Sequence, residues 1–190
     1  MPLAAEGCQP FLVGQKVHLR PLAEGDLAGP YLDWLNDPEV TRFMETGTFP
    51  TTPEGLRRYY EAVAQNPDNV MLAIVDAASG RHIGNVKLGP LHRIHRRADM
   101  GIMVGDKTFW GTGAGHEAVA LVLHYGFDRL NLHKVTLGVY ACHSQAVKLY
   151  ESLGFKIEGS LREHLFRDGA YWEMYVMGIL AEEYRTGARE

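Results

Sequence analysis

The 190 residues, 46% of them hydrophobic and 22% charged, are enough to bury a core, and we expect one globular domain over residues 1–190. The net charge of −4 supplies no cationic field, so neither nucleic acid nor a membrane surface is an expected partner. Cys8 and Cys142 are too few for a disulfide framework or a thiolate metal site, and no N-terminal apolar run resembles a secretory signal, which favours a cytoplasmic protein.

Hydrophobic spacing predicts both strands and helices in the first half of the chain. Asp26 is the expected N-cap of a short helix. A longer helix should start at Thr51 or Thr52, because Pro53 suits a first helical turn and Glu54 has the capping-box spacing from Thr51. After an arm over 1–14, the expected elements are a strand over 15–22, a helix over 27–35, a helix ending at 65, an antiparallel hairpin of 70–75 with 82–88, and a strand over 99–104.

The second half of the chain begins with the longest predicted helix, over residues 113–130. Ala118, Leu121, Val122 and Tyr125 recur at i, i+3, i+4 and i+7, which places them on one helical face. The remaining expected elements are a strand over 134–140, a helix over 144–152 that ends before Leu153-Gly154, two long strands over 155–166 and 171–179 joined at Asp168-Gly169, and a tail over 185–190.

Gly111, Gly113 and Gly115 lie between a predicted strand and the start of this longest helix. The first turn of a helix has unpaired N–H groups and partial positive charge, so it can bind a phosphate where no Cβ blocks the backbone. Tight packing of a strand against a helix also selects glycines. A dinucleotide fingerprint fails at His116, and the Gly-Lys-Ser/Thr of a P-loop is missing.

Two segments resemble the signatures of the GNAT superfamily of N-acetyltransferases. The glycine run resembles the acetyl-coenzyme A pyrophosphate signature Q/R-x-x-G-x-G/A, with Gly113 and Gly115 at its last two fixed positions and Trp110 in place of Gln or Arg. Residues 143–155 resemble the second signature, N-x-x-A-x-x-L-Y-x-x-x-G-F, with His143 in place of Asn. Residues 156–163 and 167–172 are similar to the C-terminal hairpin of the branch that acetylates ribosomal-protein N-termini and spermidine.

This resemblance, which covers about Lys16 to Tyr184, implies a fold and a reaction. The family fold is mixed α/β, with a mostly antiparallel central sheet that splays in a V and is flanked by helices. The implied reaction is direct transfer of an acetyl group from acetyl-CoA to a primary amine in a ternary complex. A homodimer is compatible with the resemblance. The alternative is a non-catalytic acyl-CoA sensor or interaction module of the same fold.

The resemblance also implies roles for individual residues. Tyr150 would assist the departing thiolate, although it could simply pack its helix on the sheet. Asp99 would accept the proton of the amine, directly or through water, although a salt bridge with Arg97 would equally explain it. The residues expected to contact acetyl-CoA are Ile102, Met103, Val104, Trp110, Gly111, Thr112, Gly113, Ala114, Gly115, His143 and Lys148.

The acceptor is expected to contact a segment that mixes aromatic and acidic side chains, unless this segment is only a solvated face. Carboxylates beside an aromatic wall attract a cationic amine. Its candidate residues are Trp34, Asp37, Glu39, Phe43 and Glu45. An amino sugar, a polyamine and a peptide or protein N-terminus all stay open as acceptors. His92 and His95 lack an acidic or sulfur partner, so no metal is expected.

Overall fold

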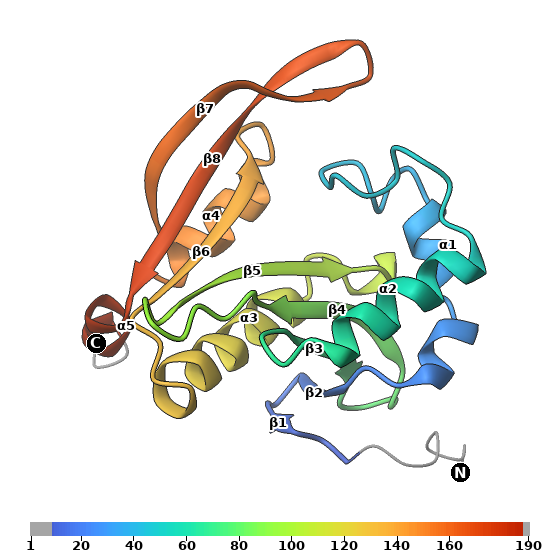
Figure 1. The fold of residues 1–190 in the computed structure, drawn as a ribbon, viewed down its shortest axis with the longest axis horizontal. Coiled ribbons are helices and arrows are strands. Elements are labelled where there is room, and N and C mark those ends of the chain that lie inside the picture. Colours follow the sequence, from blue (N-terminus) through green and yellow to red (C-terminus); the bar gives the residue numbers. More distant parts are fainter. Residues whose placement is uncertain (1–8, 188–190) are drawn as a thin grey trace. The chain divides into compact units, whose positions relative to one another are not determined.

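A computed structural model describes residues 9–187 (Figure 1). Parts of the predicted arm and tail, residues 1–8 and 188–190, lie outside the described residues, as does Cys8. The contacts divide the chain into two compact units. Unit 1 contains the described residues up to Leu88 together with Ile102–Val122, and unit 2 contains Gly89–Gly101 together with the described residues from Leu123 onward. The expectation of one domain stays a prediction.

Unit 1 is built on four strands that pair antiparallel in chain order. The predicted hairpin of residues 70–75 and 82–88 is confirmed, with Leu72 opposite Val86. Buried Leu19 and Ile74 face each other across the neighbouring pair. The strands are β1 (Leu12–Val13), β2 (Val17–Pro21), β3 (Val70–Asp76) and β4 (His82–Leu88).

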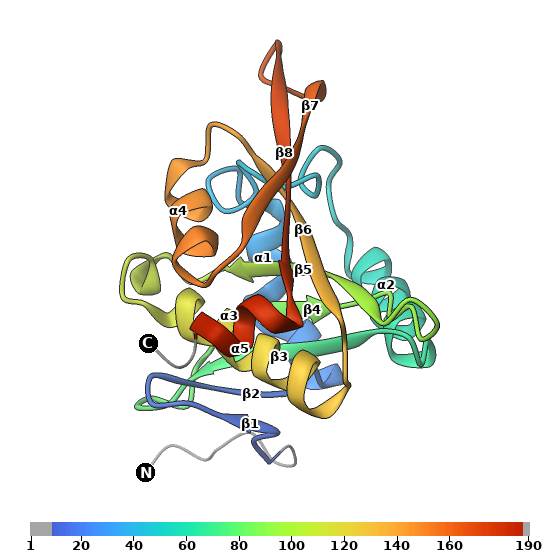
Figure 2. The same cartoon turned by 90° about the vertical axis from the view of Figure 1, so that its left-hand side faces the viewer.

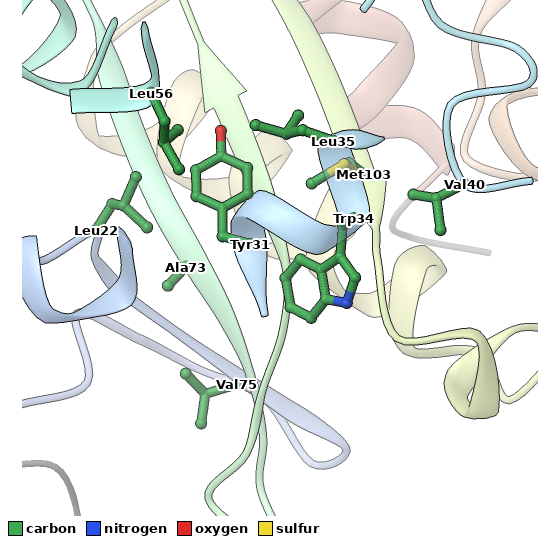
Figure 3. Packing of buried hydrophobic residues seen from close by; sticks show 9 residues of the cluster. All are labelled: Leu22, Tyr31, Trp34, Leu35, Val40, Leu56, Ala73, Val75 and Met103. Atoms are coloured by element: carbon green, nitrogen blue, oxygen red, sulfur yellow. The ribbon is translucent and has the colours of Figure 1, made fainter. Parts of the chain in front are cut away.

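Three helices of unit 1 pack an apolar cluster against β3: η1 (Glu24–Ala28), α1 (Tyr31–Asn36) and α2 (Pro53–Gln65). Unit 1 also contains the short helix η2 (Lys107–Phe109). Burial of such side chains stabilises the unit by about 1.5–3 kcal/mol for each large aliphatic or aromatic group. The cluster, drawn in Figure 3, contains Leu22, Tyr31, Trp34, Leu35, Val40, Leu56, Ala73, Val75 and Met103.

One predicted helix start in unit 1 is wrong and another is confirmed. Asp26 does not cap an α-helix, because its carboxylate accepts the N–H of Ala23 at 2.8 Å and pairs with both terminal nitrogens of Arg20 at 2.7 Å. The helix instead begins at Tyr31, after Pro30, which has no N–H to continue a helix from residue 27. The start of α2 is as predicted: its N-cap is Thr52, whose Oγ1 accepts the N–H of Gly55 at 3.0 Å.

Unit 2 contains the other strands and both C-terminal helices. The strand β5 (Arg97–Val104) begins in unit 2 and ends in unit 1. It pairs in parallel with β6 over Arg97–Asp99 and Lys134–Thr136, whereas β8 pairs antiparallel with both β6 and β7. The strands are β6 (Lys134–Tyr140), β7 (Lys156–Arg167) and β8 (Ala170–Leu180), and the helices are α4 (Ser144–Ser152) and α5 (Ala181–Gly187).

The hairpin of β7 and β8 extends beyond β6 and α4 in both views (Figures 1 and 2). Asp168 and Gly169 form its turn with φ of 54° and 79°, which confirms the predicted junction. The longest predicted helix is shorter than expected: α3 (Ala114–His124) passes into a π-helical turn, η3 (Tyr125–Arg129). Phe127 of this turn stacks on Tyr184 of α5, with ring centroids 5.0 Å apart. Among the helices of the described residues, none combines the length and apolarity needed to cross a membrane.

Candidate active site

The glycine turn leads from η2 into α3 within unit 1. Gly111 has a φ of 73° and Gly113 a φ of 89°, a region that only glycine enters without strain. A Cβ added to Gly111 would meet no atom within 4 Å, so the space in front of this backbone is open. The turn therefore has the uncrowded backbone and the helix N-terminus that phosphate binding needs, and acetyl-CoA would fit it.

Trp110 joins this turn to the end of β5. Its indole Nε1 donates a hydrogen bond of 2.7 Å to the carbonyl of Val104. A Cβ added to Gly115 would stand 3.4 Å from the Val104 side chain, so the first turn of α3 packs closely on the strand end. This gives Trp110 a structural contact at the position where the family signature has Gln or Arg. Ile102 and Val104 are half-buried and Met103 is buried.

Lys16, which sequence analysis missed, also reaches the glycine turn. Its Nζ donates a hydrogen bond of 2.7 Å to the carbonyl of Thr112. Glu117 of α3 accepts the N–H groups of Gln15, Lys16 and Val17 at 3.0, 2.7 and 2.7 Å. Burial by itself would raise the pKa of Glu117, but these backbone hydrogen bonds and the charge of Lys16 lower it. No local signal marks this contact, because about a hundred residues separate its partners.

The acidic part of the predicted acceptor segment holds a lysine. Lys107 of η2 lies 2.9 Å from an oxygen of Asp37 and 2.7 Å from one of Glu39. The hydrogen bond from Lys107 is the main cause that lowers the pKa of Asp37, and the hydrogen bonds to Glu39 and Asp37 raise the pKa of Lys107. Glu45 is exposed. Two of the predicted carboxylates therefore already surround an alkylammonium group.

The predicted aromatic wall is divided between core and surface. Trp34 is only 8% exposed and belongs to the apolar cluster (Figure 3). Its ring lies 5.1 Å from that of His82, and a Cβ at Gly105 would overlap it. Phe43 is half-buried beneath the guanidinium of Arg42, at 5.2 Å. Contact of either ring with an acceptor stays a prediction.

Tyr150 lies in unit 2 on α4, where it is 9% exposed. Burial raises the pKa of its hydroxyl to about 12, and its ring packs against that of Phe155 with centroids 5.7 Å apart. The hydroxyl therefore stays protonated at neutral pH. His143 is the N-cap residue of this helix, and burial lowers its pKa. Lys148 is exposed.

Asp99 is an exposed residue of β5, between buried Ala98 and Met100. It lies opposite Thr136 of β6, whose hydroxyl donates a hydrogen bond to the carboxylate. This partner was not indicated by the sequence. Within residues 9–187, no group of three or more His, Cys, Asp or Glu side chains lies close enough together to hold a metal ion.

The sequence model of the family described as "Acetyltransferase (GNAT) domain" matches residues 16–156. The chain belongs to the GNAT acetyltransferase family. The predicted family, the mixed fold with mostly antiparallel strand pairing, and the assignment as an N-acetyltransferase are thereby confirmed. The similarity extends to the predicted spermidine branch, which two relatives of this GNAT enzyme illustrate.

The spermidine N(1)-acetyltransferase of Escherichia coli K12 is 30% identical over 169 residues, 88% of each chain. The crystal structure of spermidine N-acetyltransferase from Vibrio cholerae, in complex with CoA and spermine, has a TM-score of 0.83 and 29% identity, and the match covers 90% of this chain and 99% of that one. A putative acetyltransferase from T. thermophilus has a TM-score of 0.76 and 31% identity, over 94% and 93% of the two chains.

Proposed function

We propose that the chain transfers the acetyl group of acetyl-CoA to a primary amine of a polyamine by direct attack in a ternary complex. The glycine turn at the N-terminus of α3 carries this proposal, because the space in front of its backbone is open at Gly111 and could accommodate a pyrophosphate. The Vibrio cholerae relative was crystallised with CoA, which supports the same donor here.

The acidic pair of Asp37 and Glu39 supports a polyamine as the acceptor. Lys107 presents to it an alkylammonium group, the same chemical group that a polyamine carries at each end. The related enzymes from Escherichia coli and Vibrio cholerae are named for spermidine. An amino sugar or a peptide N-terminus offers one ammonium, whereas a polyamine offers several and gains more from clustered carboxylates.

Two residues of unit 2 assist the proposed reaction: Asp99 accepts a proton and Tyr150 donates a hydrogen bond. Asp99 takes the proton that the ammonium must lose before its nitrogen can attack the thioester, either directly or through a bound water. Its hydrogen bond from Thr136 orients the carboxylate. Acetyl-CoA, when bound, supplies the acetyl group and the thiolate leaving group.

Tyr150 stabilises the thiolate by donating a hydrogen bond rather than by giving up its proton. Its pKa is raised to about 12, whereas a thiol such as that of cysteine has a pKa of about 8.5. Full proton transfer to the thiolate would therefore be unfavourable by about 5 kcal/mol, at about 1.36 kcal/mol per pKa unit. A protonated donor aimed at developing charge lowers the barrier without that cost.

The test is an amine panel assayed for release of free thiol from acetyl-CoA. We expect spermidine and spermine to release thiol and to gain the mass of an acetyl group, with little turnover of amino sugars or peptide N-termini. Turnover of only the latter two would contradict the polyamine proposal. Binding of acetyl-CoA in calorimetry without turnover of any amine would favour the non-catalytic sensor.

A further inference from the structure

We infer that Lys16 is a phosphate-binding residue of the donor site, where its ammonium pairs with a phosphate group of coenzyme A beside the glycine turn. The inference rests on the proposed use of acetyl-CoA. It adds to the backbone N–H groups a positively charged side chain from a distant part of the sequence, outside both family signatures.

The ammonium of Lys16 lies at the glycine turn. Nζ of Lys16 lies 2.7 Å from the carbonyl of Thr112 and 2.8 Å from the point where a Cβ of Gly113 would stand. It therefore lies beside the backbone that would carry the pyrophosphate. An ammonium has three donors, of which the Thr112 carbonyl takes one. A phosphate oxygen is a stronger partner for the others than water, because both groups are charged.

Glu117 holds the lysine in this place. Its carboxylate accepts three successive backbone N–H groups, including that of Lys16, while its own N–H donates to the carbonyl of Gly113 at 3.0 Å. A Cβ at Gly14 would stand 2.7 Å from this carboxyl group, so a glycine is needed for the close approach. The residue before β2 is thus tied to the first turn of α3, which lowers the entropic cost of placing the ammonium.

The charge of Glu117 does not cancel the effect. A carboxylate near a phosphate would normally repel it, but the three N–H donors and Lys16 compensate this charge, and they lower the pKa of Glu117 against the opposing effect of burial. The turn consequently presents an ammonium and the open backbone at Gly111 to an anion, while the ionised carboxylate of Glu117 is directed at three backbone N–H groups.

A purely structural role is the competing explanation, since the same ammonium ties Thr112 to the strand. The two explanations differ in what the charge does. If Lys16 binds phosphate, its replacement should weaken phosphate-bearing ligands and leave the acceptor unaffected. If it only supports the turn, the unfolding temperature should fall, and arginine, with its different geometry, should not restore the contact.

The experiment measures acetyl-CoA affinity by calorimetry for the full chain and for Lys16→Met, Lys16→Arg and the control Lys156→Met. Lys156 also loses one charge but pairs with Glu183 in unit 2. We expect Lys16→Met to raise the Kd about tenfold, the size of one charge-assisted hydrogen bond at an exposed site. The Kd of Lys16→Arg should stay within about threefold of the wild-type value. The Kd of the control Lys156→Met should equal the wild-type value.

Three further readouts decide the matter. The Michaelis constant of the amine and the unfolding temperature should stay unchanged in Lys16→Met. Binding of 3′-dephospho-CoA to wild type and to Lys16→Met identifies which phosphate Lys16 contacts. If Lys16→Met still binds this ligand tenfold more weakly than wild type does, Lys16 contacts the pyrophosphate. If the two proteins bind it equally well, Lys16 contacts the 3′-phosphate. An unchanged Kd in folded Lys16→Met, or equal losses for Met and Arg, would overturn the inference while the proposed function stands. Failure of the wild type to bind acetyl-CoA would instead overturn both.

Discussion

Substitution of Gly113 by valine tests the donor site most directly. At a φ of 89°, a residue with a Cβ adopts a left-handed conformation that costs roughly 1–2 kcal/mol, with more for a β-branched side chain. The new Cβ would stand 2.8 Å from Nζ of Lys16. The lysine end is flexible and can move, but it then leaves the turn. The valine methyl groups would also obstruct the backbone to which the pyrophosphate binds.

We expect Gly113→Val to unfold more easily by about 1–2 kcal/mol and to bind acetyl-CoA at least tenfold more weakly, a loss of about 1.4 kcal/mol or more. Calorimetry and urea unfolding measure the two effects. Gly169→Val is the matched control, because its φ of 79° imposes similar strain and no atom lies within 4 Å of its Cβ. Wild-type affinity in folded Gly113→Val, or an equal loss of affinity in Gly169→Val, would refute this placement of the pyrophosphate.

The other predictions concern single side chains of both units. Tyr150→Phe should lower turnover about 10²-fold or more and leave acetyl-CoA binding unchanged. The pH profile below pH 10 should also stay the same, because the pKa of Tyr150 in the wild type is about 12. Wild-type turnover in this variant would remove Tyr150 from the mechanism. Asp99→Asn should shift the pH–rate profile to higher pH, and an unshifted profile would show that another group is the base. Glu39→Gln should raise the Michaelis constant of the polyamine and Lys107→Met should lower it, while the Michaelis constant of acetyl-CoA stays unchanged in both. If both variants have the wild-type constant for the polyamine, the acidic segment is only a solvated face. Asp26→Asn should cost about 3–5 kcal/mol of unfolding free energy at neutral pH, because it breaks the ion pair between buried Asp26 and the largely buried Arg20. Burial alone would raise the pKa of Asp26, but its hydrogen bonds lower it. The stabilisation by Asp26 is therefore present above about pH 4 and disappears as pH falls through the pKa of the folded protein. If urea unfolding gave the same stability difference between wild type and Asp26→Asn at every pH, the role assigned to Asp26 would be contradicted.

The sequence by itself determined the features that depend on neighbouring residues. Strand spacing predicted β3 and β4, and helical spacing together with the second signature predicted α4. Gly111 and Gly113 could be recognised because they lack a Cβ just before a predicted helix start, and the structure adds that both have a positive φ. Such signals lie within a few residues of each other, where chain geometry alone relates pattern to structure.

Only the tertiary structure decided which partner each of several side chains contacts. Asp26 has the sequence context of a helix cap, yet Arg20 holds it in another role. Trp34, predicted to line the acceptor site, is packed in the core. Lys16 reaches Thr112 across 96 residues, and Lys107 reaches Glu39 across 68. Periodicity carries no information over such separations, because the contact exists only after the strands and helices between its partners have packed.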